Sequence, residues 1–250
     1  MSALLTAFSV LTILPLNRGA SGSERDIVPS VLFFPLVGLV IGGLLMVMTR
    51  ALQPILSPGP LAAVILLTAI VITGGLHLDG LADLCDGLAA GGSRDRMLSV
   101  MKDSHIGAFG VMGLVIVLIL KYSLFFEVMT KGRLNSFLIM GLLSRWAMVL
   151  GMTFGRYARE NGTAKPFIGR VGWRRCVTAT ATVIGFSWWI LTGPGLLIVL
   201  LVLLSVLLFN QFLKRRIGGL TGDALGALNE VTEVVVLLCI VAVVPFMESR

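Results

Sequence analysis

The sequence predicts an all-α integral membrane protein, built as a polytopic bundle of helices. Three observations lead to this fold class: 56% of the 250 residues are hydrophobic, only 13% are charged, and the mean hydropathy is +0.97. A soluble domain carries about 25% charged residues, roughly twice this share. The long apolar runs lack the alternation of β-barrel strands, so the membrane-spanning structure is expected to be the α-helix.

Apolar runs of roughly 20 residues, the length that crosses a bilayer as a helix, define the expected spans. The N-terminal run SALLTAFSVLTIL is shorter than this and predicts an interfacial or re-entrant helix packed against the bundle. We expect residues 1–250 to form a single polytopic membrane domain. Its expected spans number about seven, with an error of one: Val31–Leu52, Leu61–Leu76, Ala108–Val128, Asn135–Phe154, Cys176–Leu191, Gly195–Phe212 and Val231–Phe246.

Lys and Arg are distributed unevenly among the loops between these runs. Most of them lie before the first run, where Arg18 is found, and in the segments Arg94–Lys102, Arg156–Arg175 and Lys214–Arg216. The positive-inside rule places these loops in the cytoplasm. We therefore expect a bacterial or archaeal cytoplasmic-membrane protein with a cytoplasmic N-terminus and an external C-terminus. The net charge of +7 reflects this topology, and no nucleic-acid partner is predicted.

Three carboxylates follow the second apolar run, in the stretch HLDGLADLCDG. Asp79, Asp83 and Asp86 are spaced i, i+4, i+7, which places them within roughly 60° of one another on a helix face. Like charges this close destabilise a helix unless something positive neutralises them. An all-oxygen set favours a hard divalent cation, and carboxylates at a membrane span usually serve function. A solvated helix end that is merely acidic is the alternative.

A second charged segment, SRDRMLSVMKDSHIGAFG, runs from Ser93 to Gly110. Ser93 is a typical N-cap for a short helix, and the mixture of apolar and basic residues after it predicts that this helix lies on the membrane surface. We expect Asp103, at the end of this segment, to fold back to the three carboxylates as a further metal ligand. A charged loop without a metal is the alternative.

A third segment, GGLTGDALGALNEVTE, runs from Gly218 to Glu233. Its glycine-rich turn is expected to open a helix, and such a turn binds anions through its backbone N–H groups. Asp223, Glu230 and Glu233 share a broad face of that helix. The alternative is a glycine-rich connector with ordinary caps.

Two basic side chains lie inside expected spans. We expect Arg145 to pair with a carboxylate or to reach a substrate phosphate, and Lys121 to snorkel toward water. The loop after the fourth expected span is a candidate phosphate clamp, with Arg156, Arg159 and Lys165 beside Tyr157; a solvated loop is the alternative. Carboxylates that hold Mg²⁺ beside Arg and Lys at a cytosolic membrane face indicate phosphoryl transfer from a nucleotide-activated substrate.

The segments GGLHLDGLADLCDG, RDRMLSVMKDSHIGAFG and GGLTGDALGALNEVTE resemble the three signature blocks of the cobalamin synthase family, the adenosylcobinamide-GDP ribazoletransferases. FFPLVGLVIGG and GRYARENG also match in the same order, so the resemblance covers essentially the whole chain. It implies an enzyme that uses Mg²⁺ to join adenosylcobinamide-GDP to α-ribazole or its 5′-phosphate. GMP leaves, and adenosylcobalamin or its 5′-phosphate forms.

Within this resemblance we assign residue roles as hypotheses. Asp79, Asp83, Asp86 and Asp103 would coordinate Mg²⁺, and Asp83 or Asp86 would also act as general base, with His77 as a rival. The resemblance leaves open a homo-oligomer or a complex with other cobalamin-assembly enzymes. Substrate contacts are expected from His77, Arg94, Lys102, Ser104, Arg145, Tyr157, Arg159, Thr221, Asp223 and Glu230.

Two other functions are kept as alternatives. A CDP-alcohol phosphotransferase also uses helical aspartates and a metal, but its pattern places Ala-Arg shortly after the Asp-Gly, whereas Leu88–Gly91 follows here without an arginine. A polytopic transporter usually places its binding groups near the bilayer midplane in repeated halves. No repeat is evident in this sequence, and the carboxylates gather at one face.

Overall fold

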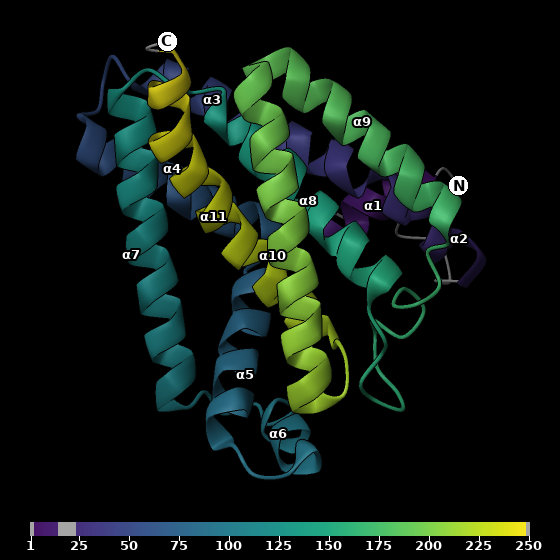
Figure 1. Cartoon of the computed structure of the whole chain (residues 1–250). Helices are drawn as coiled ribbons and strands as arrows, with labels where there is room; N and C mark the ends of the chain where they lie inside the picture. The colour runs from purple at the N-terminus through teal and green to yellow at the C-terminus, as the bar shows by residue number, and fades with distance from the viewer. Residues whose placement is uncertain (1–2, 15–23, 249–250) are drawn as a thin grey trace.

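The computed structural model describes residues 3–14 and 24–248, and its described elements are all helices, as the composition predicts (Figure 1). The short helix expected at the N-terminus is present as α1 (Ala3–Leu11), which is too short to span a membrane. It is followed by α2 (Glu24–Ser30) and a 3₁₀ turn (Val31–Phe33). Arg18, which contributed to the predicted topology, lies outside the described residues.

Five of the described helices are long and apolar enough to cross a membrane, and a sixth span arises if one bent pair counts as one. The expected number of seven is therefore not confirmed. The bent pair is α4 (Pro58–Thr73) with α5 (Leu76–Ala90). The five are Ile27–Leu52, which contains α3 (Phe34–Leu52), then α7 (Ala108–Thr130), α8 (Ser136–Phe154), α10 (Gly193–Ile217) and the part Gly222–Val243 of α11 (Gly222–Glu248).

Two local features account for the difference. Gly74 and Gly75 have φ angles of 62° and 69°, a left-handed conformation that suits glycine, and α4 and α5 meet there at 88°. The expected span Leu61–Leu76 therefore ends in a sharp bend before the carboxylates begin. The expected span Cys176–Leu191 lies in α9 (Trp173–Leu191), whose threonines and arginines make it too polar to be counted among the five.

Helix α8 lies at the centre of the bundle, and almost all of its residues are buried. It approaches α3 closely because glycines face each other across the contact. A Cβ atom on Gly38 would overlap the carbonyl oxygen of Gly141, and one on Gly141 would overlap that of Gly38. Small residues allow membrane helices to pack backbone against backbone in this way.

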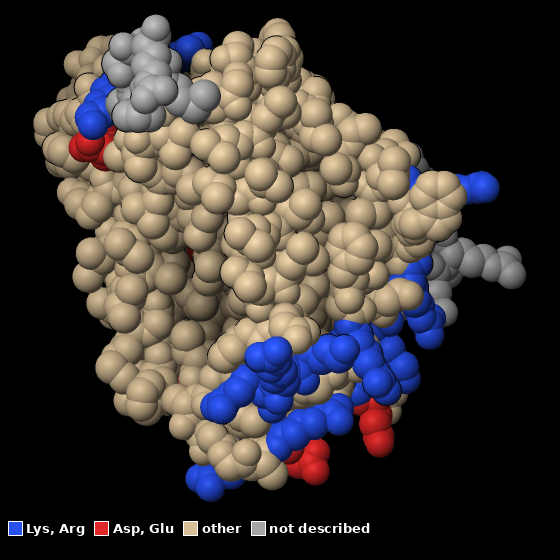
Figure 2. Space-filling model, in the orientation of Figure 1, with Lys and Arg blue, Asp and Glu red and all other residues tan. Residues whose placement is uncertain are grey.

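The described charges on the surface are concentrated at one end of the molecule. Figure 2 shows Lys and Arg gathered over the end where α6 (Arg94–Val100) and the last turns of α10 lie, with a smaller charged group at the opposite end. The face between them carries almost no charged side chains in this view. This asymmetry is what the positive-inside rule leads one to expect of the cytoplasmic end, and the orientation itself stays a prediction.

Candidate functional site

Two glycines bring α5 against the first turns of α11. A Cβ atom on Gly80 would lie 2.7 Å from the carbonyl oxygen of Asp223, and one on Gly226 would lie 3.1 Å from the Cα atom of His77. The glycines that the sequence places beside the carboxylates therefore serve close helix packing. In Figure 1, α5 runs from this contact toward α6, while α11 runs from it to the C-terminus.

The contact gathers carboxylates from both helices. Asp79, Asp83 and Asp86 lie in α5, which confirms the predicted helix. Asp83 is partly buried and lies within electrostatic range of Asp79, Asp86, Asp223 and Arg159. Asp223, expected as a substrate contact, thus joins the carboxylates of α5 from the start of α11.

Arg159 is the cation of this group. Its Nη2 atom lies 2.8 Å from Oδ2 of Asp223, and both side chains are largely buried. The loop that carries Arg159 is fixed to the turn before α11 by two backbone hydrogen bonds. The N–H of Ala158 donates to the carbonyl of Leu220 at 2.8 Å, and the N–H of Leu220 donates to the carbonyl of Arg156 at 2.7 Å.

Two other predicted substrate contacts, Arg94 and Thr221, hold this loop and turn in place. The Nη2 atom of Arg94 donates to the carbonyl of Ala158, and the backbone N–H of Ala224 donates to Oγ1 of Thr221 at 3.1 Å. Through this hydrogen bond Thr221, which is fully buried, caps the first turn of α11. The glycine-rich segment predicts a helix start at this place. Both side chains already have internal partners. Tyr157, in the same loop, is partly buried, and this burial raises the pKa of its hydroxyl.

Asp86 has a role that the sequence did not indicate. Its two carboxylate oxygens accept the backbone N–H groups of Gly107 and Gly110 at 2.7 and 2.8 Å, so it caps the N-terminus of α7. A Cβ atom on either glycine would overlap this carboxylate. The glycines of the HIGAFG segment are therefore explained by the approach of Asp86.

The structure does not show the expected convergence of Asp103 on the carboxylates of α5. Oδ1 of Asp103 instead accepts the backbone N–H of His105 at 3.0 Å and lies 2.7 Å from its Nδ1, with 57% of the side chain exposed. The backbone N–H, followed by the ring, lowers the pKa of Asp103. Its neighbours Lys102 and Ser104 are exposed. Among the described residues, no three His, Cys, Asp or Glu side chains are gathered closely enough to hold a metal ion.

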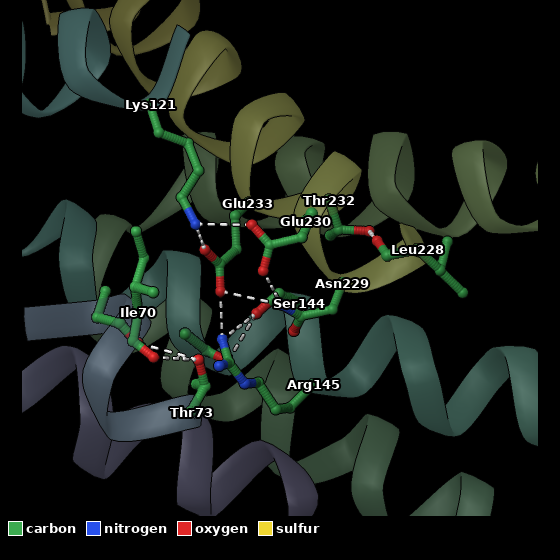
Figure 3. Close-up of polar contacts among 12 residues, drawn as sticks. Ile70, Thr73, Lys121, Ser144, Arg145, Leu228, Asn229, Glu230, Thr232 and Glu233 are labelled. Atoms are coloured by element: carbon green, nitrogen blue, oxygen red, sulfur yellow. Dashed lines mark hydrogen bonds and ion pairs between the residues drawn. The ribbon is translucent and has the colours of Figure 1, made fainter. Parts of the chain in front are cut away.

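A second set of charges is buried inside the bundle, where α7, α8 and α11 meet (Figure 3). Nζ of Lys121 lies 2.9 Å from Glu230 and 2.6 Å from Glu233, and Arg145 pairs with Glu233. The amide of Asn229 donates to both glutamates at 3.2 Å. All four charged residues are at most 4% exposed.

The buried network tests three of the predictions, with different outcomes. The expected pairing of Arg145 with a carboxylate is confirmed, whereas the expected snorkelling of Lys121 is wrong because the glutamates satisfy its charge internally. Glu230 was expected to contact substrate and is instead buried against Lys121. The sequence did contain a signal for the network, since two cations and two carboxylates within apolar segments can neutralise each other.

A cavity of about 410 Å³ lies beside the carboxylates, and Asp79, Asp223 and His77 are among its lining residues. Most of its other lining side chains are apolar and come from α1, α3, α8 and the loop after α8. These residues could not be predicted from the sequence, because single apolar side chains carry no distinguishing pattern in an apolar chain.

Comparison with known proteins gives a consistent result. The model of the family described as cobalamin-5-phosphate synthase matches residues 3–241. The adenosylcobinamide-GDP ribazoletransferase of Geotalea daltonii is 38% identical over 238 residues, which cover 95% of this chain and 96% of the relative. Proteins of the same name from Desulfitobacterium hafniense and Desulforamulus reducens are each 36% identical, with 95% and 96% of this chain covered. No solved structure matches. The chain therefore belongs to the cobalamin-5-phosphate synthase family and is a transferase of cobalamin synthesis.

Proposed function

We propose that the protein joins adenosylcobinamide-GDP to α-ribazole, or to its 5′-phosphate, with release of GMP. The observation that carries this proposal is the group formed by Asp79, Asp83, Asp223 and Arg159 beside a largely apolar cavity. Relatives that share more than a third of their residues with the chain bear the name of this reaction. The aromatic nucleoside would bind the apolar cavity and the charged pyrophosphate would bind the charged group, so the reaction needs the two side by side.

The reaction is a substitution at phosphorus. The oxygen of a ribose hydroxyl of α-ribazole forms a bond to the phosphorus on the cobinamide side, and the bond from that phosphorus to the bridging oxygen breaks. GMP leaves with the bond's electron pair, and the hydroxyl proton passes to a carboxylate. We assign this proton to Asp83, which lies among the other carboxylates and is less exposed than Asp79.

Arg159 would hold phosphate oxygens. A guanidinium group matches the geometry of phosphate with two parallel hydrogen bonds. In the structure its partner is Asp223, at 2.8 Å, and the exposed Asp79 lines the same cavity. An arriving pyrophosphate would therefore compete with Asp223 for Arg159.

Asp79, Asp83 and Asp223 are the residues that would hold Mg²⁺, one or two of them together with phosphate oxygens of the substrate, since no three described side chains are gathered closely enough to hold the ion alone. Their oxygens are donors that this ion prefers, and their charge exceeds that of Arg159. Bound Mg²⁺ supplies neutralisation of the charge on the pyrophosphate. In this proposal Asp223 replaces Asp103 as a metal ligand, because Asp103 pairs with His105. Asp86 is left out of the metal site because both of its carboxylate oxygens accept backbone N–H groups at the start of α7.

The proposal is tested with purified protein in detergent. Adenosylcobinamide-GDP, α-ribazole and Mg²⁺ are supplied, and GMP and the corrinoid product are separated by chromatography. The proposal is supported if GMP and cobalamin form in equal amounts and if neither forms after the metal is chelated. A folded protein that forms neither would refute it, and a parallel reaction with a CDP-alcohol and a second alcohol would then show whether the rival transferase activity is present.

A further inference from the structure

The cavity beside the carboxylates has two chemically different sides. Asp79 and Asp223 lie on the side of the proposed reaction, and His77 lines the cavity as well. Its volume of about 410 Å³ is in the range of small-molecule sites. Much of the remaining wall is formed by large apolar side chains: Leu11, Phe34, Met148, Met152, Phe167 and Leu225.

The apolar wall is suited to a flat aromatic ring. The rings of Phe34 and Phe167 lie with their centroids 6.3 Å apart and are tilted by 51°. Aromatic rings prefer such offset or edge contacts, and methionine sulfur also packs favourably against ring edges. Met148 and Met152 lie in α8 and are almost fully buried.

His77 is among the lining residues, but its side chain is directed elsewhere. It is 1% exposed and lies within electrostatic range of Arg145, Glu233 and Lys121, and it falls on roughly the opposite face of α5 from Asp79. The side chains that a ligand in the cavity would meet are therefore those of the apolar wall together with Asp79 and Asp223.

We propose that this cavity receives the aromatic base of α-ribazole; this inference rests on the proposed function. The benzimidazole ring system is largely apolar and matches the apolar wall. The ribose attached to it then lies on the side of Asp79 and Asp223. The edge of guanine carries several donors and acceptors, which the apolar wall would leave unpaired, so the guanine of the second substrate binds elsewhere.

The test measures binding of α-ribazole to the purified full chain by titration calorimetry, without turnover. Phe167→Ala is expected to weaken α-ribazole binding by about tenfold or more and to leave binding of adenosylcobinamide-GDP unchanged. Phe125→Ala is the control, because Phe125 is likewise one ring of an aromatic pair and is fully buried, but lies in α7 and does not line the cavity. Weaker binding of adenosylcobinamide-GDP alone would place guanine in the cavity and overturn the inference, as would unchanged binding of both substrates.

The same binding measurement distinguishes failure of this inference from failure of the proposed reaction. If the wild type binds α-ribazole in the cavity but forms no product, the proposed reaction fails while the base site stands.

Discussion

Helix α11 carries two groups of charges, about two turns apart, that differ in their balance. At its start, Asp223 adds to the carboxylates of α5, and Arg159 is the cation within range of them. Further along, Glu230 and Glu233 meet Lys121 and Arg145 one for one in the bundle interior, where all four are at most 4% exposed. In the balanced group each charge is neutralised by a partner within the protein. The surplus of negative charge in the other group needs a positively charged ligand from outside.

The two groups therefore serve different purposes. Removing charges from water is costly, and the buried pairs recover that cost only through their mutual contacts. Their value lies in fixing how α7, α8 and α11 meet. The carboxylates beside the cavity are more exposed, and we assign them the chemistry. Four substitutions test this division, in order from the largest expected effect to the smallest.

Asp83→Asn removes the proposed proton acceptor with almost no change in size. Loss of a general base lowers turnover by about 10²–10⁴-fold, and we expect a loss in this range in the GMP-release assay. The midpoint of thermal unfolding should stay close to the wild-type value because Asp83 makes no ion pair with any of the residues that the structure describes. A variant that keeps full turnover would remove Asp83 from the mechanism.

Glu233→Ala leaves Arg145 without its carboxylate and Lys121 with one of its two. Breaking a buried ion pair from one side costs about 3–5 kcal/mol of folding free energy, and denaturant unfolding in detergent measures this loss. Glu127→Ala is the matched control, because Glu127 pairs with Lys131 at 2.6 Å where both side chains are exposed. That pair should contribute less than about 1 kcal/mol. Equal effects in the two variants would contradict the structural role of the network.

Asp86→Ala removes the cap from the N-terminus of α7. We expect a loss of about 1–2 kcal/mol in stability, together with faster hydrogen exchange at the amides of Gly107 and Gly110. Asp95→Ala, at an exposed position in the first turn of α6, provides a comparison with a much smaller change. If Asp86→Ala instead abolished turnover at unchanged stability, its predicted place in the metal site would be restored.

Asp103→Asn should have the smallest effect. The N–H of His105 lowers the pKa of Asp103, so this contact stabilises the fold above the unfolded-state pKa and is lost only as the pH falls through the folded-state pKa. Near neutral pH we expect turnover within about twofold of wild type and an unchanged Mg²⁺ requirement. A large increase in the Mg²⁺ concentration needed for half-maximal turnover would identify Asp103 as a ligand.

The sequence was informative where a local pattern decides the structure. Hydropathy predicts the helical class, the i, i+4, i+7 spacing places three aspartates on α5, and Ser93 does accept the backbone N–H of Arg96 as an N-cap. It was uninformative where partners are distant in the chain. Asp86 meets its glycines across more than 20 residues, and the contact between Arg159 and Asp223 depends on the pairing of two loops.

The expected number of seven spans was not confirmed for a related reason. Average hydropathy does not register that Gly74 and Gly75 turn the chain by 88°, or that α9 combines sufficient length with too many polar residues. The apolar cavity is a further case, because its walls come from segments at both ends of the chain and become a site only when they are assembled.

The division between the two charge groups is tested most directly by turnover of a variant that keeps the buried group neutral. Lys121→Met combined with Glu230→Gln removes one cation and one carboxylate, and Arg145 still pairs with Glu233. We predict that the folded double variant releases GMP within about tenfold of the wild-type rate, since the network fixes the helices and takes no part in the chemistry. A folded variant of normal thermal stability that is as inactive as Asp83→Asn would contradict this account.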